Sequence, residues 1–316
     1  MIVKKRLVPH RLQVLEALMR RLNANHPKMP SIKEDFARRI SGFQGEQNID
    51  YQLSLLPQNS FCILNDLRLP NKQYFFQIDS LLLNRKFAVI IEIKNITGTL
   101  LFDQSFKQLI RTIDGQEEGF QYPLLQADNQ RRQLLEFFQQ HELNPLPIET
   151  LVVISNPETV IKASYNPDEI SNKVIHSELL VSKLNELKAQ YVERPSIPLE
   201  PIQQKLLASH RKETIRAYMM KGVKESEIKT GVECPQCHTI PMVRLHSRWH
   251  CPYCRHDSRD AHNRAISDYL LLIKPSITNR ECQRFLHLHS RHTAKRLLKF
   301  QLSFSGKSNK RVYYKG

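Results

Sequence analysis

The 316-residue sequence has few glycines, a single tryptophan and no long apolar run. No stretch reaches the roughly 18 apolar residues of a membrane span, so we expect no transmembrane helix and no membrane partner. The basic first residues lack the apolar core of a secretory signal, which predicts a cytoplasmic protein with reduced thiols. Hydrophobic residues make up 41% and charged residues 25% of the chain, as in a globular protein of two or three domains.

The charge of the chain is positive and unevenly distributed. The formal net charge is +16, and the 88 residues from 229 to 316 hold 17 Lys or Arg against 5 Asp or Glu. A concentrated basic surface favours polyanions because binding releases their counterions. We therefore expect DNA as the partner, with RNA as the second choice. General adhesion to acidic proteins is the simpler alternative.

Two buried strands are predicted at residues 74–83 and 86–93, within the stretch YFFQIDSLLLNRKFAVIIEIKN. Three functionally interesting charged residues lie within or at the end of these apolar segments: Asp79, Glu92 and Lys94. Because side chains alternate along a strand, Glu92 and Lys94 share one face. If the two strands pair as a hairpin, Asp79 approaches that same face.

Two carboxylates in an apolar setting repel each other unless a cation lies between them. Hard oxygen ligands suit Mg²⁺ or Mn²⁺, and a neighbouring lysine can orient a water molecule or offset the charge of a phosphate. A short pattern of this kind also occurs at solvated strand edges. The flanking residues here are too apolar for a solvated edge, which favours a metal site.

The order Asp79, Glu92 and Lys94 across a strand pair resembles the PD-(D/E)xK nuclease core. Further stretches, in matching order, narrow the resemblance to the NERD family, the nuclease-related domain, over roughly residues 40–185. These stretches are GFQGE at 42–46, FCILNDL at 61–67, ID at 78–79, IEIKN at 91–95 and YPLLQ at 122–126.

The resemblance implies an α/β fold of the restriction-endonuclease type, a mixed sheet flanked by helices. It also implies a metal-dependent nuclease in which Asp79 and Glu92 hold Mg²⁺ or Mn²⁺, joined by the carbonyl of Ile93. The ion would acidify a water molecule and polarise the scissile phosphate. Lys94 would orient that water or steady the developing charge.

Two further residues enter the site through the resemblance. Glu46 would complete the acidic cluster, although a carboxylate near a helix start is also favoured by the helix dipole alone. Gln126 would reach the site from the helix predicted at residues 124–138. Its alternative is an ordinary exposed glutamine.

The rest of the chain predicts further elements. Leucines at helical spacing predict a helix before Pro27, and Ser31 with Glu34 marks the start of a second helix ending at Ile40. A separate helix is expected over 42–56. Residues 103–119 are polar and end in a turn at 115–119, and a stiff linker at 195–201 precedes a helix over 203–221. The predicted segments are N-terminal helices (1–40), a nuclease-like domain (41–190), a linker and connecting helix (191–228), a zinc ribbon (229–260) and a DNA-binding tail (261–316).

Two CxxC motifs form the most specific pattern in the sequence. Cys234 and Cys237 are separated by 13 residues from Cys251 and Cys254. Four thiolates at this spacing suit a tetrahedral structural Zn²⁺ in a ribbon whose hairpin covers residues 241–250. Two disulfides or a redox pair are the alternatives, and a reducing compartment favours zinc. Cys62 and Cys282 are expected to be buried thiols.

The tail resembles a helix-turn-helix with a basic wing. Helices are predicted at 266–273, 278–286 and 291–299, and the last of these would enter the major groove of DNA. Strands near 300–304 and 310–314 would form the wing. A purely structural helical hairpin is the alternative. The expected nucleic-acid contacts are Arg291, His292, Lys295, Lys299, Lys307, Lys310 and Arg311.

The sequence therefore predicts a metal-dependent nuclease that acts on DNA, in DNA processing or defence. A non-catalytic DNA-binding protein, which keeps an inactive nuclease fold as a scaffold, is the main alternative. A second alternative is an interaction module whose zinc ribbon docks on another protein.

Overall fold

The computed structural model describes residues 1–144, 146–213, 222–307 and 311–315. The chain divides into two compact units. The first unit holds residues 1–7 and 40–213, and the second holds residues 8–39 and the described residues beyond 221. The predicted N-terminal helices thus group with the ribbon and the tail, while the five segment boundaries themselves stay predictions.

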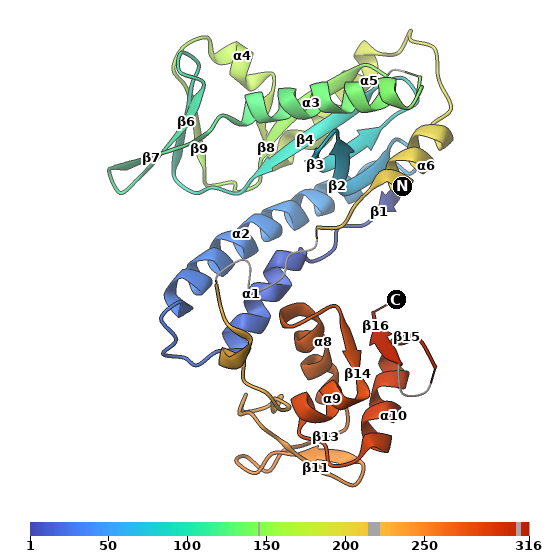
Figure 1. The fold of residues 1–316 in the computed structure, drawn as a ribbon. Coiled ribbons are helices and arrows are strands. Elements are labelled where there is room, and N and C mark those ends of the chain that lie inside the picture. Colours follow the sequence, from blue (N-terminus) through green and yellow to red (C-terminus); the bar gives the residue numbers. More distant parts are fainter. Residues whose placement is uncertain (145, 214–221, 308–310, 316) are drawn as a thin grey trace. The chain divides into compact units, whose positions relative to one another are not determined.

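A six-stranded mixed sheet forms the centre of the first unit (Figure 1). Strands β2, β3 and β4 are antiparallel neighbours, whereas β1 joins β2, β8 joins β4 and β10 joins β8 in parallel. Helices flank the sheet, so the predicted α/β class is confirmed. In sheet order the strands are β1 (Ile2–Lys4), β2 (Cys62–Asn71), β3 (Tyr74–Leu83), β4 (Ala88–Lys94), β8 (Ile148–Ile154) and β10 (Val174–His176).

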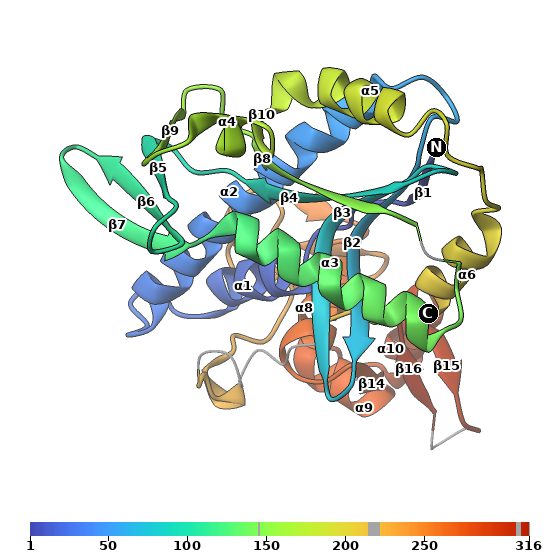
Figure 2. The ribbon, with the colours of Figure 1, turned by 90° about the horizontal axis from the view of Figure 1, so that it is seen from above.

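Each face of this sheet has its own hydrophobic core. Alternation along β4 sends Ala88 and Ile90 to the core that α3 covers, and Val89 and Ile91 to the core that α2 and α5 cover. Figure 2 shows α3 along one face and α5 along the other. The helices of this unit are the end of α2 (Met29–Ser54), α3 (Pro123–Gln140), α4 (Pro167–Ser171), α5 (Leu180–Gln190) and α6 (Glu200–Ser209).

A second sheet of four strands lies in the same unit. The residues taken as a polar stretch ending in a turn form strands β6 and β7, and the turn lies earlier than predicted. Asp114 and Gly115 connect the two strands with φ of 50° and 76°, the positive angles that a tight two-residue hairpin needs. The strand order is β7 (Gln116–Gln121), β6 (Gln108–Ile113), β5 (Thr99–Asp103) and β9 (Val160–Ala163).

Helix α2 is one continuous helix where two were predicted. It runs without interruption from the helix predicted to end at Ile40 into the helix predicted to begin at Gly42. A Cβ at Gly45 would lie 2.5 Å from Asn95 Cβ and 2.5 Å from Ser155 Oγ. This glycine therefore lets α2 approach the ends of β4 and β8 closely.

The helix predicted over 203–221 is also corrected. Helix α6 begins at Glu200, within the predicted linker, with Pro201 in its first turn, and ends at Ser209. Residues 214–221 lie outside the described residues.

The second unit has a single core that joins distant parts of the sequence. Leu15 and Leu18 of α1 (His10–Arg21) pack in one cluster with Trp249, Tyr269 and Leu298. The helices α8, α9 and α10 follow a small ribbon, and a three-stranded sheet of order β14-β16-β15 completes the unit. Its elements after the ribbon are α8 (His262–Leu272), β14 (Ser276–Thr278), α9 (Asn279–Leu286), α10 (Arg291–Gln301), β15 (Ser303–Ser305) and β16 (Val312–Tyr314).

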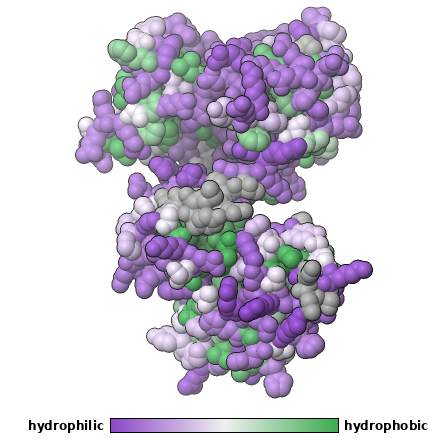
Figure 3. All heavy atoms as spheres, in the orientation of Figure 1, coloured by the Kyte–Doolittle hydropathy of each residue, from purple (hydrophilic) through white to green (hydrophobic). Residues whose placement is uncertain are grey.

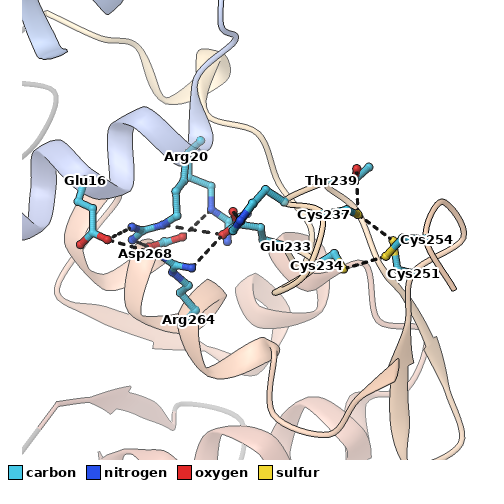
Figure 4. Close-up of polar contacts among 12 residues, drawn as sticks. Glu16, Arg20, Glu233, Cys234, Cys237, Thr239, Cys251, Cys254, Arg264 and Asp268 are labelled. Carbon is cyan, nitrogen blue, oxygen red and sulfur yellow. Dashed lines mark hydrogen bonds and ion pairs between the residues drawn. The ribbon is translucent and has the colours of Figure 1, made fainter. Parts of the chain in front are cut away.

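A buried ion-pair network ties α1 to α8 within the second unit. Arg21 Nε lies 2.8 Å from Asp268 Oδ2, and both side chains are fully buried. Arg20 Nη2 lies 2.7 Å from the other oxygen of Asp268. Figure 4 shows Arg20 among Glu16, Glu233 and Asp268. Removal of either partner of such a pair would leave a buried charge unpaired.

The surface is largely hydrophilic. None of the described helices is long and apolar enough to cross a membrane. In the space-filling view, hydrophobic residues form small, separated patches (Figure 3). Single exposed aromatic side chains occur in both units, among them Phe106 and Phe300.

The two glycines of α2 provide a matched pair of variants. Gly45→Ala should lower the free energy of unfolding by about 1–3 kcal/mol, because the new methyl group forces α2 away from Asn95 and Ser155. Gly42→Ala has open space around its Cβ and should be neutral or stabilising by up to about 1 kcal/mol through helix propensity. Urea denaturation of both proteins measures the difference, and equal stabilities would show that the close approach is not required.

Candidate active site

Glu92 and Lys94 lie on the face of β4 that α3 covers, as the alternation predicts. Lys94 Nζ donates hydrogen bonds to Glu92 Oε1 at 2.7 Å and to Gln126 Oε1 at 3.0 Å. Gln130, one turn further along α3, donates from Nε2 to Glu92 Oε2 at 2.7 Å. The Glu92 side chain is only 2% exposed. The structure thus brings Glu92, Lys94 and Gln126 together and adds Gln130, which the sequence analysis missed.

Asp79 joins this group from the neighbouring strand. The β3–β4 ladder pairs Ser80 with Ile91, and beyond that pair Asp79 Oδ2 accepts the backbone N–H of Ile93 at 2.9 Å. The partner strand β2 is irregular opposite Asp79, because Asp66 has a φ of 52° and is skipped by the ladder. Such irregularities in a strand ladder redirect the side chains beside them.

Glu46 is held near the acidic pair by an arginine that the sequence analysis did not single out. Arg6 Nη1 donates to Glu46 Oε2 at 2.8 Å, while Arg6 Nε and Nη2 bind the carboxylate of Asp50 at 3.1 and 3.2 Å. Arg6 Nη2 also donates to Ser80 Oγ at 2.8 Å, and the arginine side chain is 3% exposed. Neither Arg6 nor Asp50 belongs to a local motif, which explains why only the structure reveals them.

The buried carboxylates of the site resist ionisation. Burial, followed by the nearby Glu46 carboxylate, raises the pKa of Asp79 from 3.8 to about 6. Burial, followed by the Asp79 carboxylate, raises the pKa of Glu92 from 4.5 to about 7, against the opposing effect of Lys94. Burial also raises the pKa of Glu46, which the Arg6 guanidinium opposes. The three carboxylates therefore form one coupled acidic cluster.

The donor set fits a hard divalent cation, because carboxylate oxygens are the ligands that Mg²⁺ and Mn²⁺ prefer. A cation would offset the repulsion that raises the pKa values of Asp79 and Glu92. Gln130 Oε1 adds a buried oxygen without a hydrogen-bond partner. Within the described residues, however, Glu46, Asp79 and Glu92 do not form a group of three side chains that could hold a metal ion, so Asp79 and Glu92 are the candidate pair of carboxylate ligands.

The four predicted cysteines converge in the second unit (Figure 4). Their sulfur atoms all lie within 4.8 Å, with Cys234 Sγ 3.6 Å from Cys254 Sγ and Cys237 Sγ 3.5 Å from Cys251 Sγ. Sulfur atoms held about 2.3 Å from a tetrahedral zinc ion lie about 3.8 Å apart. The arrangement thus suits a four-thiolate metal site. All six cysteines are free, and Cys62 and Cys282 are buried as predicted.

A small antiparallel sheet supports the four cysteines. Its hairpin is the predicted one, formed by β11 (Val243–Leu245) and β12 (Arg248–His250). A third strand, β13 (Asp257–Ser258), pairs with β12 and was not predicted. The nearby His238 and His250 contact Glu233 and Asp257 through Nδ1, and neither belongs to the four-cysteine group.

The predicted tail residues lie on α10 and the β15–β16 hairpin. Arg291, His292, Lys295 and Lys299 are exposed, whereas Ala294, Leu297 and Leu298 face the core. Thr278 caps α9, and its capping box with Glu281 is complete. Lys307 is exposed, Arg311 lies 4.3 Å from the Phe304 ring, and Lys310 lies outside the described residues.

Comparison with known families identifies the first unit in part. Residues 41–155 match the family model of the nuclease-related domain. This span contains Glu46, Asp79, Glu92, Lys94 and Gln126, and it excludes the cysteine cluster and the tail. Searches of curated proteins and of solved structures gave no match.

The raised pKa of Asp79 predicts a pH-dependent effect of its removal. An acid whose folded-state pKa is raised binds a proton on folding, so its contribution to stability falls as pH rises from about 4 to about 6. Without divalent metal, Asp79→Asn should therefore raise the melting temperature at about pH 8. The corresponding gain in the free energy of unfolding is on the order of 3 kcal/mol, at about 1.4 kcal/mol per pKa unit. At about pH 5 the difference should shrink, because Asp79 is then mostly neutral.

Thermal melts at the two pH values check this, with Mg²⁺ added in a parallel series. Mg²⁺ should stabilise the wild-type protein at about pH 8 and leave Asp79→Asn unchanged. Asp50→Asn is the matched control, since the Asp50 carboxylate binds Arg6 and its loss should destabilise at both pH values. A variant Asp79→Asn that melts below the wild type at about pH 8 would contradict the assignment of a repulsive pair.

Proposed function

We propose that the first unit is a metal-dependent nuclease that hydrolyses phosphodiester bonds of DNA. The observation that supports this most is the placement of Lys94, Glu92 and Asp79 together within the span that matches the nuclease-related domain. A lysine beside two buried carboxylates suits phosphodiester hydrolysis, in which a divalent cation and a positive group meet one phosphate.

Each residue has a separate task in this proposal. Asp79 and Glu92 would hold Mg²⁺ or Mn²⁺, and the bound ion would supply Lewis acidity and a more acidic water molecule. Lys94 would position that water or offset charge on the phosphate, and Gln126 fixes the lysine amine by accepting its hydrogen bond. Gln130 orients Glu92, while Arg6 holds Glu46 at the edge of the cluster.

The second unit would bind the nucleic acid and stabilise its own fold with zinc. Zn²⁺ is the ion that four cysteines in two CxxC motifs prefer, and its role here is structural because all four positions are filled by protein. The net positive charge of residues 229–316 and the exposed cations of α10 support binding of a polyanion. DNA is the proposed ligand, with α9 and α10 as a helix-turn-helix-like reader.

One observation favours the alternative of an inactive scaffold. Lys94 pairs directly with Glu92, whose side chain is almost fully buried, so the lysine also serves as a structural counter-charge. In a scaffold, loss of Lys94 would leave a buried carboxylate unpaired and would lower stability by roughly 3–5 kcal/mol. In a nuclease, the same loss would act mainly on the cleavage rate.

Replacement of Lys94 by alanine separates the two functions. For a nuclease, Lys94→Ala should lower Mg²⁺- or Mn²⁺-dependent nicking of supercoiled plasmid by about 10²-fold or more, on the order of one lost electrostatic group. Its melting temperature with metal present should stay near that of the wild type. Lys162→Ala, at an exposed position on β9 of the same unit, is the matched control and should leave nicking unchanged.

The scaffold predicts the opposite pattern for the same protein. A large drop in the melting temperature of Lys94→Ala, together with no nicking by the wild type in either metal, would overturn the nuclease assignment. Glu92→Gln, purified in the same way, controls for contamination by another nuclease. It should show no metal-dependent nicking.

A further inference from the structure

Helix α10 presents a basic face that carries one exposed aromatic residue. The helix sequence is RHTAKRLLKFQ and contains no acidic residue. His292, Lys295, Arg296, Lys299 and Phe300 are all exposed. Among the described residues, Lys295 and Arg296 form no ion pair, so their charges are available to a ligand.

This face forms one wall of a cleft of about 710 Å³. The opposite wall is the segment that leads into α8, including Arg259, Asp260 and Asn263. Leu297 and His262 line it as buried residues, and Trp249 Nε1 donates to His262 Nδ1 at 3.1 Å, which fixes that imidazole. The cleft therefore has two buried side chains in its lining, and its walls carry four Lys or Arg side chains against one carboxylate.

Phe300 is the feature that the helix-turn-helix prediction does not explain. Its side chain is 89% exposed at the edge of the cleft. The neighbouring Phe304, by contrast, lies 5.9 Å from the Tyr313 ring and has Arg311 over its face. Within the described part of the chain Phe300 makes no ring contact and no cation–π contact, so both faces of its ring are free to stack.

Cations along a groove with an exposed aromatic ring are the elements that bind unpaired nucleotides. The cations follow the phosphates, and the ring stacks on a base. In an intact duplex the bases are stacked on one another and offer no free face, so Phe300 would gain nothing from paired DNA. An acidic peptide could match the charges but would not need a ring that is free on both faces.

We infer that the cleft between α10 and the start of α8 binds a segment of nucleic acid with unpaired bases, one of which stacks on Phe300. The inference rests on the proposed function in one respect: if the first unit is a nuclease, its substrate is DNA that contains single-stranded regions. Binding itself is independent of cleavage. It is therefore measured in EDTA, where the nuclease reaction is absent.

The test compares binding of fluorescein-labelled oligothymidylate and of a duplex of similar length by the full chain, using fluorescence anisotropy. Phe300→Ala should weaken binding of the single strand about tenfold, as expected for one lost stacking contact, and should change duplex binding by less than about twofold. Phe300→Tyr should restore single-strand binding, whereas Phe300→Leu should not. Phe106→Ala, which removes a ring that is 83% exposed in the first unit, is the matched control and should bind as the wild type does.

The double variant Lys295→Ala, Lys299→Ala should bind both the single strand and the duplex more weakly. The salt dependence of binding should also fall, because phosphate contacts are lost. Zinc content and thermal melts of each variant check that the second unit is folded. Equal single-strand affinities of Phe300→Ala and wild type, or equal losses for single strand and duplex, would overturn the inference. Tighter binding of a glutamate-rich peptide than of oligothymidylate would also overturn it and would assign the cleft to an acidic protein. None of these results depends on whether Lys94 supports cleavage.

Discussion

The repulsion between the buried carboxylates of Asp79 and Glu92 is the constraint on which the proposed site depends. Both groups lie in the apolar centre of the first unit, where ionised carboxylates are costly without a partner. The protein supplies partial compensation from three sources: the Lys94 amine, the Gln130 amide and the backbone N–H of Ile93. This compensation leaves both pKa values raised. A fold that keeps such an unfavourable pair on the two central strands of its sheet is readily understood if a divalent cation completes it.

Strand alternation and helix packing place the residues of the candidate site close together. Alternation on β4 places Glu92 and Lys94 against α3, so the glutamines of that helix meet them one turn apart. Close packing at Gly45 brings the helix that carries Glu46 onto the ends of β4 and β8. The second unit follows a different principle, because its core combines a helix near the start of the chain with the ribbon and the tail. The Arg21–Asp268 pair joins α1 to α8 across this long separation in sequence, and the four clustered cysteines lie in the small ribbon.

Local patterns predicted much of this arrangement from the sequence. The period of two in residues 88–94 placed Glu92 and Lys94 together, and the CxxC spacing identified the cysteine site. The features that sequence reasoning missed depend on contacts between distant residues. Arg6 meets Glu46 and Asp50 only when β1 pairs with β2, and Gln130 matters only because α3 lies over β4. Helix α2 was predicted as two helices that meet near Gly42, because glycine disfavours a helix interior. Only the structure shows that Gly45 is needed inside α2, where Asn95 and Ser155 leave no room for a Cβ. The Asp114-Gly115 hairpin did carry a local signal, which the polar composition of the stretch concealed.

The most direct measurement of the central claim is the binding of Mn²⁺ to the protein at about pH 8, followed by electron paramagnetic resonance of the free ion. The cysteine site is first filled with zinc so that it does not compete. If Asp79 and Glu92 hold a divalent cation, the wild-type protein should remove Mn²⁺ from solution and Mg²⁺ should displace it. Glu92→Gln should lose this binding while it stays folded. A folded wild-type protein that leaves all Mn²⁺ free, or a Glu92→Gln protein that binds Mn²⁺ as the wild type does, would show that Asp79 and Glu92 do not hold a cation.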